Sequence, residues 1–264
     1  MNIVVCMKQV PGTTGVQINP QTNTLVREGI KGIINPFDTF ALEEGVRLKE
    51  RCGGTVKVVS MGPPQAEEML REALSLGADE AILLSDAAFA GADTWATAFT
   101  LATAIKKLGQ YDIVICGRQT MDGDTGQVGP ELSEMLGIPF VGYVCQIQDI
   151  SERHARLRRM VDEGYEIYET PLPAVITVTK EINVPRLPSL RGISRAKKTS
   201  IPVWTINELG VDKGMVGLSG SFTRVVRVFT PQRTSRGEIF QGEMDDQVER
   251  LIEKLKAAGV CRTG

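Results

Sequence analysis

The chain has 264 residues, enough for one large domain or for one domain with a substantial appendage. Hydrophobic residues make up 42% of it and charged residues 23%, which predicts an ordinary globular protein with a real core. The formal net charge of −2 argues against a polyanionic partner, and no apolar run reaches transmembrane length. The five cysteines are scattered and form no C-x-x-C pair, so we expect a cytoplasmic protein with no stable membrane insertion.

Strands and helices alternate through the first half of the sequence. Residues 3–7 form a continuous apolar run, typical of a central parallel strand, and residues 16–29 predict a short hairpin with its turn at 19–23. A helix over 39–51 with Asp38 as N-cap is expected next, followed by a strand over 55–61. The helix after it has an apolar face and ends at Gly77; the face consists of Ala66, Met69, Leu70, Ala73 and Leu74. A strand over 80–84, a helix over 94–108, a strand over 111–116 and a helix over 130–136 complete this part. This order predicts an α/β fold with a doubly wound parallel sheet of the adenine-nucleotide-binding kind.

The pattern changes after residue 140. Strands over 141–150, 155–162 and 165–169 predict a β meander with a turn at Glu163 and Gly164, and 173–179 returns as an apolar strand. Residues 203–242 carry only short apolar groups between Gly, Ser, Thr and Pro, so we expect an extended arm on another surface, with a small subdomain as the alternative. A helix over 243–258 follows, with an apolar face that needs a docking surface. These patterns predict an α/β nucleotide-binding domain over 1–202 and a C-terminal arm and helix over 203–264.

Residues 117–129 form a glycine-rich loop between a predicted strand and a predicted helix. Such a loop binds phosphate because small residues let the backbone approach and unpaired N–H groups attract an anion. Gly123, Gly126 and Gly129 supply the freedom, and Thr125 and Gln127 add hydrogen-bonding groups. The loop matches neither standard phosphate signature, so a simple tight turn is the alternative.

Residues 183–200, called the basic segment below, contain five cations and no acidic residue. The segment lacks aromatic side chains, which disfavours nucleic acid and leaves a solvated charge run or a docking site. Pro185 and Pro188 stiffen it, which lowers the ordering cost of binding, and Leu190 and Ile193 are apolar in polar surroundings.

Several motifs in order along the chain resemble the β subunit of electron transfer flavoproteins. They are residues 4–11 (VVCMKQVP), 35–38 (NPFD), 59–63 (VSMGP), 74–79 (LSLGAD), the loop 117–128, 185–190 (PRLPSL), 196–198 (AKK) and 230–233 (TPQR). Each motif is weak by itself, but the ordered set spans the chain and is specific.

The resemblance implies a heterodimer with an α subunit that carries the electron-transferring FAD. Carried over by position, the cofactor contacts of this chain are Cys6, Asn35, Pro36, Phe37, Asp38, Met61, Gly117, Arg118, Gln119, Thr120, Met121, Asp122, Gly123, Asp124, Thr125, Gly126, Gln127 and Val128. Plainer roles stay open at several of them, such as a helix entry at Asn35, capping by Asp38 or Thr125, and loop-fixing turns at Asp122 and Asp124. The resemblance implies no catalytic residue and no metal, and His154 is expected to face solvent.

Family members divide by the nucleotide that the β subunit binds. One class holds structural AMP and only carries electrons; another binds a second FAD, takes hydride from NADH, and sends electrons to the α-subunit FAD and to ferredoxin or flavodoxin. Gly123 and Gly126 stand where the AMP class has larger polar residues, which favours FAD with NADH as substrate.

The resemblance also makes the basic segment the docking site for an FAD-dependent dehydrogenase of acyl-CoA or hydroxy-acid type, with Leu190 as anchor beside Arg191, Ile193, Arg195, Lys197 and Lys198. A free-standing ATP- or AMP-binding module is a third alternative, but it leaves this segment and the arm without a purpose.

Overall fold

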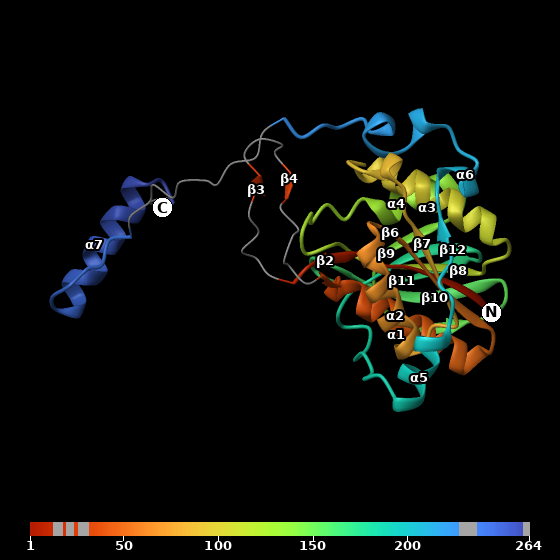
Figure 1. The fold of residues 1–264 in the computed structure, drawn as a ribbon. Helices are drawn as coiled ribbons and strands as arrows, with labels where there is room; N and C mark the ends of the chain where they lie inside the picture. Colours follow the sequence, from red (N-terminus) through yellow and green to blue (C-terminus); the bar gives the residue numbers. More distant parts are fainter. Residues whose placement is uncertain (13–17, 20–23, 26–31, 227–236, 261–264) are drawn as a thin grey trace. The chain divides into compact units, whose positions relative to one another are not determined.

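A computed structural model describes residues 1–12, 18–19, 24–25, 32–226 and 237–260 (Figure 1). The chain divides into two compact units, Met1–Val226 and Arg227–Gly264. The described part of the second unit contains one helix, α7 (Met244–Ala257), with an ion pair of 2.7 Å between Lys254 Nζ and Glu238 Oε2. Among the described residues, no helix is long and apolar enough to cross a membrane.

A nine-stranded sheet runs through the first unit (Figure 1). Across the sheet the strands are β11 (Gly164–Pro171), β10 (His154–Val161), β9 (Phe140–Ile150), β12 (Ala174–Val178), β8 (Ile113–Gly117), β1 (Asn2–Cys6), β6 (Thr55–Met61), β7 (Glu80–Leu84) and β13 (Val203–Trp204). In this sheet order, every pair from β9 across to β13 at the far edge is parallel. At the other edge, β9, β10 and β11 form an antiparallel meander. The predicted α/β class, parallel sheet and meander are therefore confirmed.

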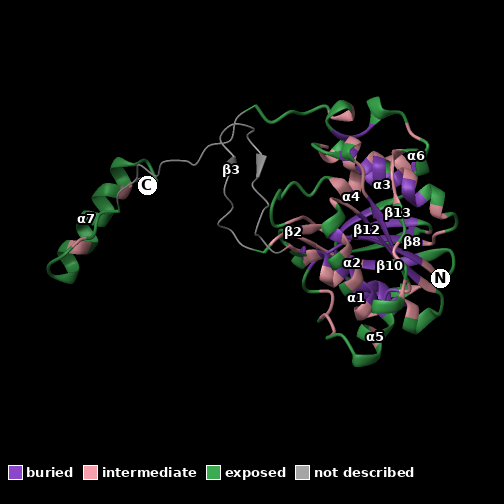
Figure 2. Ribbon diagram, viewed as in Figure 1, coloured by how far each residue is buried: buried purple, intermediate pink, exposed green. Residues whose placement is uncertain are grey.

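Helices cover both faces of this sheet (Figure 1). One layer contains α1 (Pro36–Cys52), α2 (Glu67–Leu76) and, packed on α2, α5 (Leu190–Lys198); the other contains α3 (Thr94–Leu108), α4 (Val128–Leu136) and α6 (Ile206–Leu209). Successive side chains of a strand point to opposite faces, so Ile3 and Val5 enter one core and Val4 and Cys6 the other. Burial on both faces explains the continuous apolar run in β1, and Figure 2 shows the buried residues concentrated in these central strands.

Short elements complete the described structure. They are the antiparallel pairs β2 (Gln9–Pro11) with β5 (Gly32–Ile34) and β3 (Ile18–Asn19) with β4 (Thr24–Leu25), and the 3₁₀ turns η1 (Pro64–Ala66), η2 (Ala87–Phe89), η3 (Lys213–Met215) and η4 (Gly217–Gly220). The β3–β4 pair is the predicted hairpin, whose turn lies partly outside the described residues.

Local predictions failed at two positions. Helix α1 begins at Pro36, so Asp38 lies inside its first turn and is not the N-cap. Its side chain instead accepts a hydrogen bond from the backbone of Lys8, which ties the helix to β1. The turn between β10 and β11 falls at residues 162–163, one position before the predicted turn, because Gly164 already pairs with Val161.

Residues 203–226 pack on the first unit, beyond the boundary expected at residue 202. Val203 and Trp204 form β13, which pairs with Leu83 and Leu84 of β7. Further along, Ser221 Oγ accepts a hydrogen bond of 2.8 Å from the backbone N–H of Asp93 at the start of α3. A short apolar group can form a strand in this way because the existing edge of the sheet supplies hydrogen-bonding partners, although Val203 stays 46% exposed.

Candidate functional site

The expected cofactor residues gather at the carboxyl edge of the parallel sheet. Strands β1, β6 and β8 end there at Cys6, Met61 and Gly117, and α1 and α4 begin there. From β1 the chain winds outward through β6 and β7 and then crosses to β8 on the other side of β1. Such a reversal of winding opens a crevice at the strand ends, which is where ligands bind in sheets of this kind.

Asn35 ties the glycine-rich loop to the start of α1. Its side chain is fully buried, its Nδ2 donates to the carbonyl of Gln119 at 2.9 Å, and its Oδ1 accepts from the N–H of Met121 at 3.1 Å. It makes no side-chain capping bond to its own helix. The Asn35 side chain therefore fixes the course of the loop through both of its polar atoms.

Lys8 supplies a second tether that the sequence analysis missed. Its Nζ contacts both carboxylate oxygens of Asp122 at 2.7 and 2.8 Å. Although burial raises the pKa of Asp122, the hydrogen bonds and charge of Lys8 outweigh it, so the pKa is lowered. This cation neutralises the negative charge that Asp122 would otherwise place in the loop. The sequence did hold a signal for this contact, since Lys8 lies just past the end of β1, at the same carboxyl edge of the sheet as the loop.

Asp38 sits beneath the loop and faces the protein. It is 4% exposed, and its Oδ2 accepts a hydrogen bond of 2.7 Å from the N–H of Lys8. Burial raises its pKa to about 7, against the opposing effect of its backbone and side-chain hydrogen bonds. A Cβ at Gly117 would lie 2.4 Å from Asp38 Oδ1, so this close approach requires glycine at the end of β8. The carboxyl group thus holds β1, α1 and β8 together.

The second half of the loop has the form of an anion cradle. Gln119 Nε2 donates to Asp124 Oδ1, and Asp124 and Gly126 adopt left-handed backbone angles of φ 54° and φ 65°. The backbone N–H groups from residue 125 to residue 129 have no acceptor among the described residues. These N–H groups lead directly into the N-terminus of α4, whose dipole attracts negative charge.

The three glycines expected to give the loop its freedom do different things. A Cβ at Gly123 would meet Thr120 Oγ1 at 3.5 Å, and one at Gly126 would meet the carbonyl of Arg118 at 3.5 Å, so there is room at both positions. A Cβ at Gly129 would lie 2.4 Å from Thr177 Cγ2, so this glycine allows α4 to pack on β12. A Cβ would therefore fit at Gly123 and Gly126 but not at Gly129.

Arg118 lies between two aromatic rings where the loop leaves β8. Its guanidinium carbon is 5.3 Å from the ring centre of Phe37 and 5.7 Å from that of Tyr143, and its Nε donates to Gln119 Oε1 at 2.7 Å. Tyr143 has φ 60° at an irregularity in β9 and is 47% exposed. Sequence pattern gave no signal for Tyr143, because its place at this edge follows from a bend within the strand.

Cys6 and Cys116 lie opposite each other on β1 and β8 and are both buried. The hydrogen bond to Cys6 and burial together raise the pKa of the Cys116 thiol. They are core thiols at the carboxyl ends of β1 and β8. The described residues hold no cluster of acidic, histidine or cysteine side chains suited to a metal ion.

The basic segment is partly helical, since residues 190–198 form α5. Leu190 is 88% exposed, and Arg191, Ile193, Lys197 and Lys198 also reach solvent. Arg195 differs, because its Nη2 donates to the carbonyls of Leu74 and Ala78. Leu190 and the other exposed side chains therefore form a possible docking surface; the Arg195 side chain is 45% exposed as well, but its guanidinium also binds within the fold.

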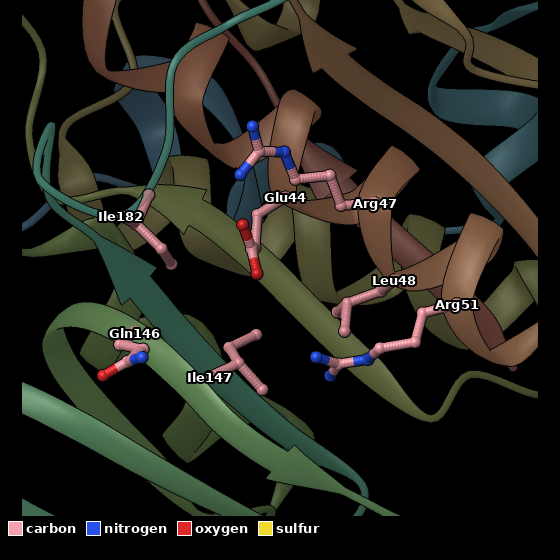
Figure 3. A pocket seen from close by; sticks show the side chains of 7 residues that line it. All are labelled: Glu44, Arg47, Leu48, Arg51, Gln146, Ile147 and Ile182. Atoms are coloured by element: carbon pink, nitrogen blue, oxygen red, sulfur yellow. The ribbon is translucent and has the colours of Figure 1, made fainter.

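A separate cavity of about 230 Å³ lies beside α1 (Figure 3). It is lined by Glu44, Arg47, Leu48 and Arg51 of α1, Gln146 and Ile147 of β9, and Ile182. None of the expected cofactor residues lines it. Burial raises the pKa of Glu44 against the charge of its neighbouring arginines.

Comparison with known proteins identifies the family of this chain. The family model of the electron transfer flavoprotein domain matches residues 22–209. The β subunit of electron transfer flavoprotein from Thermoanaerobacterium thermosaccharolyticum is 52% identical over 98% of this chain and 100% of its own length. The chain belongs to the electron transfer flavoprotein family, as a β subunit.

Two further relatives carry different names. Caffeyl-CoA reductase-Etf complex subunit CarD from Acetobacterium woodii is 47% identical, over 97% of this chain and 98% of its own. Protein FixA from Azotobacter vinelandii is 43% identical, over 97% and 94%. Electron transfer flavoprotein β subunits pair with an α subunit, and membership in the family implies a flavin or nucleotide cofactor.

Proposed function

We propose that this electron transfer flavoprotein β subunit binds FAD at the glycine-rich loop and serves in NADH-dependent electron bifurcation. The observation that carries the proposal is the run of N–H groups without described acceptors at residues 125–129, beside Gly123 and Gly126, which present no side chain to a ligand. The N–H groups suit the phosphates of a nucleotide, and the glycines, which stand where the AMP class has larger polar residues, favour FAD over AMP.

Bound there, FAD would accept hydride from NADH and release the two electrons singly, one to the α-subunit FAD and one to ferredoxin or flavodoxin. The residues of this chain bind and orient. Residues 125–129 would hold the pyrophosphate, and Asn35, Lys8 and Asp38 keep the loop in shape before the ligand arrives. A loop that is already ordered loses less entropy on binding.

The names of relatives support a dehydrogenase partner. CarD is named as a subunit of a complex that contains a caffeyl-CoA reductase. We infer that this chain likewise serves an FAD-dependent dehydrogenase of acyl-CoA or hydroxy-acid type, through the basic segment. Leu190 is the anchor of that contact because it is apolar and 88% exposed, while Arg191, Lys197 and Lys198 steer approach to an acidic surface.

The C-terminal unit is proposed to clamp the α subunit. The described part of α7 has no buried residue, although Val248, Leu251 and Ile252 share its apolar face. An exposed apolar face on a short helix requires a partner surface, and the α subunit is the obligatory neighbour.

Anaerobic titration of the purified αβ complex with NADH tests the proposed function. Stoichiometric bleaching of flavin absorbance by NADH is the expected result. A complex whose flavin is reduced by an acyl-CoA dehydrogenase but not by NADH would support the alternative, a conventional carrier whose β subunit holds structural AMP.

A further inference from the structure

The basic segment is clamped to α1 at its N-terminal end. The guanidinium of Arg186 binds two carboxylates, with its Nε 2.8 Å from Glu43 Oε2 and its Nη1 2.6 Å from Glu50 Oε1. Its backbone N–H also donates to Glu43 at 3.1 Å. Just before it, Asn183 Nδ2 donates to Glu44 Oε2 and to the carbonyl of Phe40, both at 3.0 Å. Two side chains of the segment are thus bound to one face of a rigid helix.

Glu43 is the central residue of this N-terminal clamp. Its side chain is 5% exposed and also receives a hydrogen bond of 2.8 Å from Arg47 Nε. Although burial raises its pKa, the hydrogen bonds from Arg186 outweigh that effect, so the pKa is lowered. A half-buried bidentate arginine of this kind fixes geometry far better than an exposed lysine pair.

A second clamp joins α5 to the C-terminal end of α2. Arg195 Nη2 donates to the carbonyls of Leu74 and Ala78 at 2.9 and 2.8 Å, in the last turn of α2 and just past its end. In return, Arg71 Nη1 donates to the carbonyl of Ala196 at 2.6 Å. A Cβ at Gly192 would lie 2.2 Å from the carbonyl oxygen of Ser75, so the two helices touch backbone to backbone.

Between the clamps the segment presents apolar side chains to solvent. Leu187 is 89% exposed and Leu190 is 88% exposed, and Ser189 between them caps α5 by accepting from the N–H of Gly192. These leucines have almost no contacts of their own to hold them. Their direction is therefore set by the residues that anchor the two ends of the segment.

We propose that Glu43, Glu50 and Gly192 are positioning residues for partner recognition, which hold Leu187 and Leu190 in the direction that the dehydrogenase requires. The proposal rests on the docking role given to the basic segment in the proposed function. The five cations of the segment then fall into two groups, because Arg186 and Arg195 bind within the fold. The other three, Arg191, Lys197 and Lys198, face solvent. Glu43 and Glu50 then govern docking without touching the partner.

The test uses Glu43→Gln and Gly192→Ala in the complete αβ complex. Glu43→Gln weakens the first clamp, and Gly192→Ala forces α5 away from α2 without changing any charge. Glu80→Gln is the matched control, since it removes a carboxylate whose ion pair of 3.4 Å with Lys57 lies outside the segment. Dithionite supplies the electrons, so the result does not depend on whether NADH reduces the complex.

Two readouts separate positioning from general damage. Hydrogen exchange of the backbone amides in 184–194 should accelerate by about tenfold in both clamp variants and stay unchanged in the control. The dehydrogenase concentration that gives half-maximal electron transfer should rise about threefold or more, while the maximal rate stays the same. Adding Leu190→Ala to Glu43→Gln should cost less than the sum of the two single effects, because both act on one contact.

The proposal is overturned if exchange in 184–194 is unchanged, or if exchange accelerates while the half-maximal concentration stays at the wild-type value. Full additivity of Glu43→Gln and Leu190→Ala also contradicts it. If Leu190→Ala alone leaves the half-maximal concentration unchanged, the docking role in the proposed function fails as well. Exchange in the clamp variants would then still show whether the clamps order the segment.

Discussion

Replacing Gly126 by asparagine should empty the proposed nucleotide site while leaving the protein folded. Gly126 has φ 65°, a left-handed conformation that asparagine tolerates better than other side chains. The nearest atom to an added Cβ is the carbonyl oxygen of Arg118 at 3.5 Å, an ordinary contact distance. We therefore expect a loss of only about 1 kcal/mol of stability in the free subunit.

The same side chain would extend into the space beside the loop that the proposed flavin needs. We expect the affinity of the β site to fall at least about tenfold, which corresponds to about 1.4 kcal/mol. Gly137→Asn is the matched control, because Gly137 has φ 68° and open space around it but ends α4 on the far side from the loop. The assay is cofactor occupancy after gel filtration at low protein concentration. A Gly126→Asn complex that retains both cofactors as firmly as the Gly137→Asn complex would refute the placement of the loop against the ligand.

Three further outcomes are expected. Leu190→Ala should reduce electron transfer to the dehydrogenase about tenfold or more, because burying a leucine is worth roughly 1.5–3 kcal/mol. The rate at which NADH reduces the flavins should not change. Impaired flavin reduction with normal electron transfer to the dehydrogenase would contradict the docking assignment. The pKa of Asp38 is about 7 in the folded protein, against an ordinary value of 3.8. The free energy of unfolding of the wild type should therefore fall by up to about 4 kcal/mol as the pH rises from 4 to 7. Chemical denaturation of Asp38→Asn over the same pH range should not show that loss. A chain ending at Val226 should fold but fail to co-purify with the α subunit. Stoichiometric co-purification would exclude the proposed role of the C-terminal unit in holding the α subunit.

The fold could be predicted from the sequence because each central element carries its own local signal. The apolar run of β1, the helical spacing in α2 and the glycines that end helices identify these elements without tertiary information. The cofactor edge followed from topology, since parallel strands end on one side of the sheet. The residues expected there do lie at that edge.

Apart from Tyr143, whose position follows from a bend within β9, the missed features depend on contacts between distant parts of the chain. Lys8 is 114 residues from Asp122, so no local pattern joins them. Helix α5 contains Gly192 and follows two prolines, which disfavours a helix locally, but hydrogen bonds from Arg195 and Arg71 hold it on α2. The same limit applies to Trp204, which is a strand residue only because the edge of β7 is available.

Identification of the nucleotides in the αβ complex tests the central claim most directly. Acid releases noncovalently bound nucleotides from the purified heterodimer, and chromatography separates FAD from AMP. The glycines at 123 and 126, in place of the larger polar residues of the AMP class, predict two FAD and no AMP per heterodimer. One FAD and one AMP per heterodimer would contradict the bifurcating assignment and leave the chain as the β subunit of a conventional electron carrier.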